Sequence, residues 1–199
     1  ATIFNCANPP YHQWATAWPP VYQALMAAAE RTGAVLVMMD NLYAFGPGTS
    51  MPMREHDAMN ATGEKGSVRA RMAHDLMAAH ASGRLRATLA RASDFYGPHV
   101  IGAALGERVL PNVLAGKKVS LLGALDIPHS VSFMPDVVTT MVTIAGDERA
   151  WGKPWHVPNA PAVSQRTTIE AFATAAGTTV KVGAVPKAAL SALGLFSPM

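Results

Sequence analysis

Two basic residues, Lys65 and Arg69, stand in the first turns of a predicted helix and follow a polar segment that begins at Asp40. Cations near a helix N-terminus oppose the helix dipole, so this pair is slightly unfavourable unless an anionic ligand binds there. The alternative interpretation is a solvated basic turn without a ligand. Tyr43 lies in the same polar segment and offers a phenol for proton transfer, although an aromatic residue packed at a strand exit would give the same pattern.

The strands that precede these polar residues are the reason to expect chemistry there. Residues 34–39 form an apolar run that predicts a buried strand, and ligands of open α/β sheets gather at the carboxyl ends of the strands. Asp40 directly follows this run, and Asp94 follows a second predicted strand. We interpret both carboxylates as loop caps rather than catalysts, but they lie on the edge where a ligand would bind.

The first half of the chain predicts a parallel sheet. Strands are expected at 2–7, 34–39 and 85–91, with helices at 19–31 and 67–81 between them. Alternation of strand and helix with short loops is typical of βαβ units. The sequence therefore predicts an α/β fold.

The remaining segments are less regular. Residues 45–59 form a loop rich in Gly, Pro and Met that is too long for a simple connector, which favours an active-site loop. Further elements are expected as helical stretches near 100–115, a hairpin at 116–123, a helix at 135–145, a strand at 155–157 and a helix at 164–176.

Composition excludes several classes of protein. With 199 residues, 50% of them hydrophobic and 15% charged, the chain is long and apolar enough for one well-buried globular domain. Its net charge is only +3 and no block of consecutive basic residues occurs, which argues against nucleic acid as a partner. No apolar run reaches the roughly 20 residues that span a bilayer, so no membrane partner is expected.

Cysteine and histidine usage gives no sign of a metal centre. Cys6 is the single cysteine, so it forms no intramolecular disulfide, which fits a reducing, cytoplasmic location. His74 and His80 are six residues apart on one predicted helix, whereas two metal ligands on one helix face are three or four apart. We therefore expect no metal site.

Several motifs along residues 1–175 resemble, in order and spacing, those of the extended short-chain dehydrogenase/reductase family, which includes nucleotide-sugar epimerases and dehydratases. That family shows a strand ending in small residues, a strand ending in a Ser/Thr pair, Tyr-x-x-x-Lys on a helix, and a strand ending in Arg before a Tyr-Gly-Pro turn. The similar segments here are 3–7, 40–46, 65–69, 91–98, 133–138 and 155–159.

The resemblance implies a partial Rossmann-type parallel sheet with a small substrate-binding subdomain. Residues 1–98 and 136–160 would form the incomplete Rossmann-type core, and 99–135 and 161–199 the subdomain. None of the sixteen glycines forms the Gly-rich turn that binds the pyrophosphate of a dinucleotide. The resemblance therefore implies that the chain is a fragment, which lacks the N-terminal Gly-rich half of the fold and is also cut at its C-terminus. Its open sheet edge would permit a homo-oligomer or a domain swap.

The resemblance also shows that the family's Ser-Tyr-Lys catalytic set is replaced in this chain. Asn41 stands at the Ser/Thr position, Lys65 at the Tyr position and Arg69 at the Lys position. A neighbouring guanidinium disfavours the ammonium form of a lysine, so Lys65 would serve as the acid/base. Asn41 would hydrogen-bond a substrate oxygen, and Tyr43 would supply the missing phenol.

NAD or NADP is the cofactor that the resemblance implies, with a sugar-like small molecule as the substrate. The expected cofactor contacts are residues at strand exits and the helix cation, namely Ala7, Asn8, Arg69, Ala92, Ser93 and Asp94. Aromatic residues near the first loop would either stack on a sugar or simply pack within the loop; these are Tyr11, His12, Trp14 and Trp18.

Three functions are compatible with these observations. The leading one is an NAD(P)-dependent epimerase, dehydratase or reductase that transfers a hydride between nicotinamide and a hydroxyl or keto carbon. The replaced catalytic set motivates the second, a redox-inert dinucleotide-binding regulator. The third interpretation sets the resemblance aside and takes the chain as a complete small α/β binding domain.

Overall fold

The computed structural model describes residues 1–185. The chain divides into two compact units, one made of Ala1–Ser93 with Asp136–Pro158 and the other of Asp94–Pro135 with the chain from Asn159 onward. Each unit has its own hydrophobic core.

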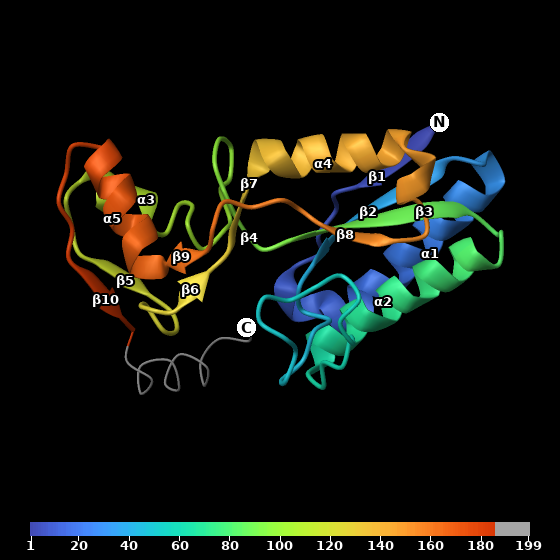
Figure 1. Cartoon of the computed structure of the whole chain (residues 1–199), viewed down its shortest axis with the longest axis horizontal. Helices are drawn as coiled ribbons and strands as arrows, with labels where there is room; N and C mark the ends of the chain where they lie inside the picture. Colours follow the sequence, from blue (N-terminus) through green and yellow to red (C-terminus); the bar gives the residue numbers. More distant parts are fainter. Residues whose placement is uncertain (186–199) are drawn as a thin grey trace. The chain divides into compact units, whose positions relative to one another are not determined.

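The first unit is built on a four-stranded sheet in which all strands run parallel (Figure 1). The strand order is β1 (Thr2–Asn5), β2 (Val35–Asn41), β3 (Arg86–Ala92) and β8 (Pro154–His156). The predicted α/β fold with a Rossmann-type parallel sheet is confirmed. Among the described strands, β1 pairs only with β2 and therefore forms one edge of the sheet.

Helices cover both faces of this sheet (Figure 1). α1 (Trp14–Thr32) and α2 (Glu64–Ala81) pack together on one face, and α4 (Met134–Gly146) lies on the other. α1 connects β1 to β2 and α2 connects β2 to β3, as expected for βαβ units. A short 3-10 helix, η2 (Glu148–Ala150), follows α4.

The core of the first unit determines which strand residues face the helix pair. Met38 on β2 and Leu89 on β3 belong to the core shared with α1 and α2. Side chains alternate between the faces of a strand, so Asp40 and Arg91, two residues further along, point to the same face. Strand register also sets Asp40 directly opposite Arg91.

α1 begins at Trp14 rather than at the predicted position 19, so Pro19 and Pro20 lie inside the helix. Prolines in a helix interior remove backbone hydrogen bonds and are unfavourable. Trp14 and Trp18, one turn apart, are only 4% and 1% exposed, and burial of two indole rings offsets this cost. The prediction from proline at a helix start was wrong because tertiary packing extends the helix upstream.

The second unit contains three two-stranded sheets and two α-helices among its described residues. β4 (Asp94–Tyr96) pairs with β7 (Val131–Phe133), β5 (Val119–Leu121) with β10 (Val182–Ala184), and β6 (Pro128–His129) with β9 (Val163–Ser164). α3 (Leu110–Leu114) and α5 (Gln165–Ala175) pack against each other, and their core includes Val113, Val119 and Ile169.

Of the helical stretches expected near 100–115, the structure contains α3. The hairpin expected at 116–123 was wrong, because β5 pairs in parallel with the distant β10 instead. Val119 and Leu121 are both buried in the second core, so burial selects this strand pairing over a local hairpin. The later helix predictions are confirmed by α4 and α5, and Ser164 caps α5 by accepting a hydrogen bond from the Thr167 N–H.

Candidate active site at the carboxyl edge of the parallel sheet

The carboxyl ends of β2 and β3 hold a buried group of three charged side chains. Arg69 on α2 contacts Asp40 at 2.8 Å from Nη2 to Oδ1, and Arg91 on β3 donates from Nε to Oδ2 over 3.1 Å. The three residues are between 2% and 5% exposed. Charged groups are buried in proteins only when they are paired, and here one carboxylate serves two guanidinium groups.

Arg69 is therefore placed differently from a surface ligand-binding residue. Its guanidinium also donates to the Met39 carbonyl and lies 5.4 Å from the Trp14 ring and 4.9 Å from the Trp18 ring. Its Nη1 has no hydrogen-bond partner among the described residues. In this arrangement Arg69 holds the end of β2 through Asp40 and the Met39 carbonyl.

An aromatic cluster lies beside this buried group and consists of Tyr11, Trp14 and Tyr43. Their ring centroids are 5.0 Å apart for Tyr11 and Trp14, 5.6 Å for Trp14 and Tyr43, and 6.0 Å for Tyr11 and Tyr43. Tyr11 and Tyr43 are 44% and 45% exposed. The Nζ of Lys65 sits over the Tyr11 ring, 3.4 Å from its centroid. The cluster thus presents aromatic rings and an ammonium group together.

The three residues predicted to be catalytic come together around this cluster. Lys65 and Tyr43 both contact the Tyr11 ring, and the Asn41 Oδ1 accepts a hydrogen bond from the Tyr43 N–H over 3.0 Å. Asn41 is the last residue of β2. An ammonium group, a phenol and an amide therefore lie near one another at the strand exit.

The loop between β2 and α2 lies at the carboxyl edge of the sheet, where charged and aromatic contacts hold it. The Glu55 Oε1 accepts a hydrogen bond from the His156 N–H over 3.1 Å, while the Arg91 guanidinium donates to the Glu55 carbonyl and to the Met59 Sδ. The Phe45 ring contacts both Arg91, at 5.2 Å, and the His156 ring, at 5.9 Å. This segment includes the predicted active-site loop.

Burial and hydrogen bonding shift the pKa values of two residues in these contacts. Burial acts to raise the pKa of Glu55, but the N–H groups and histidines around the carboxylate outweigh it and the pKa is lowered. Burial lowers the pKa of His156, so its neutral form is favoured. Glu55 and His156 are 101 residues apart, so no local sequence pattern predicts their contact. The unusual length of the loop was the one signal in the sequence that pointed to this segment.

The predicted cofactor contacts are spread along the sheet edge. Ala7 and Asn8 follow β1 and are exposed, whereas Ala92 is the buried last residue of β3, with β2 lying between these strands. Ser93 is half-buried and ends the first unit. Asp94 belongs to the second unit, where its Oδ2 lies 2.8 Å from the His129 Nε2.

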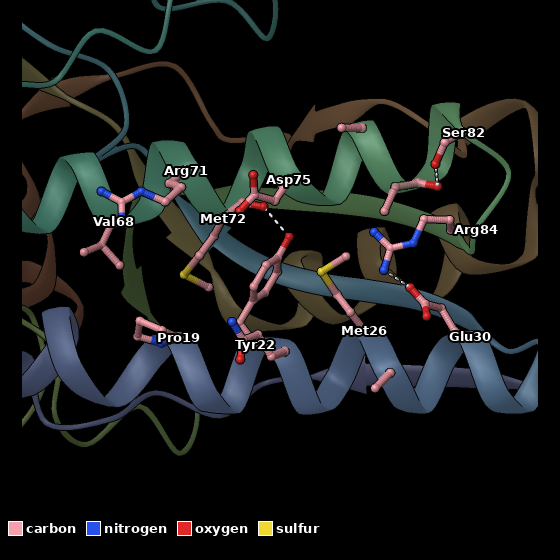
Figure 2. A pocket seen from close by; sticks show the side chains of 14 residues that line it. Pro19, Tyr22, Met26, Glu30, Val68, Arg71, Met72, Asp75, Ser82 and Arg84 are labelled. Carbon is pink, nitrogen blue, oxygen red and sulfur yellow. Dashed lines mark hydrogen bonds and ion pairs between the residues drawn. The ribbon is translucent and has the colours of Figure 1, made fainter.

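A groove of about 710 Å³ lies between α1 and α2, on the helix layer (Figure 2). Tyr22 crosses it and donates a hydrogen bond to the Met72 carbonyl, and an ion pair between Glu30 and Arg84 spans one end. Tyr22, Met26 and Met72 are already buried. The groove contains none of the predicted site residues, so the carboxyl edge remains the candidate active site.

Within residues 1–185, no three His, Cys, Asp or Glu side chains are grouped so that they could hold a metal ion. None of the described helices combines the length and apolar character needed to cross a bilayer.

No family model and no curated protein matches this chain. Solved structures match it at low sequence identity. UDP-N-acetylglucosamine 4-epimerase from Methanobrevibacter ruminantium M1, in complex with UDP-N-acetylmuramic acid, has a TM-score of 0.79 and 13% identity over 92% of this chain and 63% of that one. dTDP-glucose 4,6-dehydratase from Bacillus anthracis str. Ames, in complex with NAD, has a TM-score of 0.74 and 18% identity over 93% and 60%.

A third structure, RMD from Pseudomonas aeruginosa complexed with NADPH, has a TM-score of 0.73 and 13% identity over 93% of this chain and 69% of that one. At such identities the similarity establishes the fold alone, which is a Rossmann-like α/β fold. The chain spans between 60% and 69% of the lengths of these three proteins.

Proposed function

We propose that the protein is an NAD(P)-dependent epimerase, dehydratase or reductase that acts on a nucleotide sugar or a related hydroxy or keto compound. The observation that carries this proposal is the grouping of Asn41, Tyr43 and Lys65 at the carboxyl edge of the sheet. The fold is shared with proteins whose structures contain NAD or NADPH. Ligands of such sheets bind at this edge.

The exits of β1 and β3 fit a nucleotide cofactor. Ala7 and Asn8 are small and exposed after β1, and the buried Asn5 Nδ2 behind them has no hydrogen-bond partner among the described residues. With Ala92 and Ser93 at the end of β3, these residues would contact the cofactor. Bound NAD(P) would supply hydride transfer to or from a substrate carbon.

This chain's own residues would handle the proton and orient the substrate. Lys65 would exchange the proton of the reacting hydroxyl, with Tyr43 as a second proton donor, and Asn41 would hydrogen-bond a substrate oxygen. The exposed ring of Tyr43 would stack on the apolar face of a sugar. We also propose that the second unit is the substrate-binding subdomain that the resemblance implies.

The test combines calorimetry and kinetics on the native, full-length protein. NAD(H) or NADP(H) should bind at or below millimolar concentration, and Lys65→Met and Tyr43→Phe should each reduce turnover of a nucleotide sugar without weakening cofactor binding. Tyr43 belongs to the exposed aromatic cluster and Lys65 contacts it. Neither replacement changes the hydrophobic core, so both variants should fold. Failure to bind either cofactor at millimolar concentration would contradict the proposal.

A redox-inert dinucleotide-binding regulator is the second candidate. It is favoured by the ion pair of Arg69 with Asp40, because an arginine engaged in this way does not act on a proton-transfer group as the family's lysine does. Cofactor binding with no turnover by the wild-type protein, across a panel of nucleotide sugars, would support the regulator over the enzyme.

A further inference from the structure

Two cations on α2 lie against aromatic rings at the start of α1. Lys65 lies over the Tyr11 ring, and Arg69, one turn later, lies over the Trp14 and Trp18 rings. The attraction between a cation and the face of an aromatic ring is electrostatic. Arg69 also has a carboxylate partner in Asp40, and the Lys65 ammonium lies 3.4 Å from the centroid of the Tyr11 ring.

The position of the Tyr11 ring is itself well defined. Tyr11 opens the short 3-10 helix η1 (Tyr11–Gln13), whose Gln13 N–H donates to the Pro10 carbonyl over 2.8 Å. The ring packs edge-on against Trp14, with an interplanar angle of 67°, and against Tyr43, with an angle of 81°. The Trp14 Nε1 donates to the Pro9 carbonyl over 3.1 Å. The backbone and ring contacts that hold Tyr11 in place are therefore independent of Lys65.

We propose that Tyr11 is the positioning residue for the Lys65 amine, a role that rests on the proposed function of Lys65 in proton transfer. A lysine side chain has four flexible carbons and a compact charge, so a contact between the ammonium and a fixed ring restricts the positions that the amine samples. The ammonium lies over the ring centroid at 3.4 Å, so the ring rather than the hydroxyl makes the contact. Phenylalanine should replace Tyr11 in this role, and leucine should not.

The first measurement reads the contact without any substrate. Lysines of the native protein are dimethylated with ¹³C-formaldehyde, and the Lys65 signal is identified by its loss in Lys65→Arg. Methyl groups over a ring face are shifted upfield, so we expect an upfield Lys65 signal in the wild type and in Tyr11→Phe, and a normal shift in Tyr11→Leu. Gln13→Leu, in the same 3-10 helix, is the matched control and should leave the signal unchanged. A Lys65 signal that keeps its upfield shift in Tyr11→Leu would overturn the proposal.

The second measurement reads the consequence for the reaction. Tyr11→Phe should keep kcat within about twofold of the wild-type value. Tyr11→Leu should lower kcat by about two- to fivefold or more, because the loss of an exposed cation–π contact corresponds to a factor of this size. KM for the cofactor should stay constant in both variants. Equal losses in Tyr11→Phe and Tyr11→Leu would show that the hydroxyl is what matters and would overturn the positioning role. No turnover in the wild type would instead count against the proposed function, and the methyl signal would still decide the contact.

Discussion

Asp40 is the residue on which the carboxyl edge of the sheet depends, because its two oxygens pair with two buried arginines. Arg69 binds Oδ1 and Arg91 binds Oδ2. Removing one member of a buried charged group leaves the others without compensation, which costs far more than the group contributes as a whole. Asn41 and Tyr43, the proposed site residues, lie one and three residues after Asp40 in the sequence, so their positions depend on this group.

We predict that Asp40→Asn lowers the free energy of unfolding by about 3–5 kcal/mol, the cost of breaking a buried ion pair from one side. Asparagine keeps the size of the side chain but removes the charge. Urea unfolding, followed by the fluorescence of Trp14 and Trp18, would measure the change. Asp136→Asn, an exposed position in the first turn of α4, is the control and should cost at most about 1 kcal/mol. Equal losses in the two variants would contradict the prediction.

His129 and Asp94 form a separate pair in the second unit. The hydrogen bond that the His129 imidazole donates to the Asp94 carboxylate raises the pKa of His129, while partial burial acts in the opposite direction. A raised pKa in the folded state means that the pair adds stability below the unfolded value of about 6.5. That contribution is lost as the pH rises through the folded pKa. Both side chains are nearly half exposed, so the contribution is small.

An NMR titration of the His129 imidazole should therefore give a pKa above about 6.5 in the wild type. Asp94→Asn removes the carboxylate and should lower that pKa, because the charge that favours the imidazolium is lost. His156 in the first unit, whose pKa is lowered by burial, provides the internal reference and should keep the same pKa in both proteins. A His129 titration that does not respond to Asp94→Asn would refute the pairing.

At the scale of elements, the loop between β2 and α2 is held by contacts made far from its ends. Glu55 accepts the N–H of His156, the last residue of β8, and so links the loop to the edge of the sheet. Asn60 Oδ1 accepts the Gly46 N–H over 2.9 Å and closes the loop on itself. A loop of this length over a ligand edge would otherwise be free to open.

We predict that Glu55→Ala increases amide hydrogen exchange across residues 45–63 and at the His156 amide. Glu107→Ala, at an exposed site in the second unit, is the control and should leave the exchange of these amides unchanged.

The pKa values of Glu55 and His156 are both lowered in the folded protein. The contribution of these two groups to the stability of the folded protein is therefore complete above their pKa values in the unfolded state. It is lost as the pH falls through their pKa values in the folded state. Protection of the loop that stays constant from neutral pH to below about 4.5 would contradict this account.

At the scale of the whole molecule, each of the two units has a hydrophobic core, and among residues 1–185 these two cores share no residue. Leu76 on α2 belongs to the first and Ile169 on α5 to the second, and both side chains are fully buried. Each core is formed by segments distant in sequence, since each unit is assembled from two parts of the chain. The effect of a cavity should therefore remain within the unit that contains it.

Ile169→Ala should lower the stability of the second unit by about 2–5 kcal/mol, the usual cost of such a truncation in a core. Amide exchange should rise in α3, α5 and β5 and stay constant in α1 and α2, and Leu76→Ala should give the reverse pattern. Leu114→Ala is the matched surface control, because Leu114 is 66% exposed. If Ile169→Ala accelerated exchange equally in both units, the two cores would not be independent.

Local sequence patterns determined most of the secondary structure of the first unit. The apolar run at 34–39 and the strand at 85–91 became β2 and β3, and the helix at 67–81 became most of α2, because burial and periodicity act within a few residues. The same patterns placed Asn41, Tyr43 and Lys65 near a ligand edge. Predictions failed where burial by distant segments decided the outcome, as at the start of α1 and in the pairing of β5 with β10.

Only the tertiary structure decided which side chains meet at that edge. Asp40 lies 29 residues from Arg69 and 51 from Arg91, and their contact depends on strand register and on the face to which each residue points. The meeting of Tyr11 with Lys65 depends likewise on how α1 and α2 pack together. Spacing along the chain carries no information about either contact, since both arise from packing between elements. The sequence alone therefore determined the candidate residues, and the fold determined that Arg69 is buried with Asp40 while Lys65 lies at an aromatic ring.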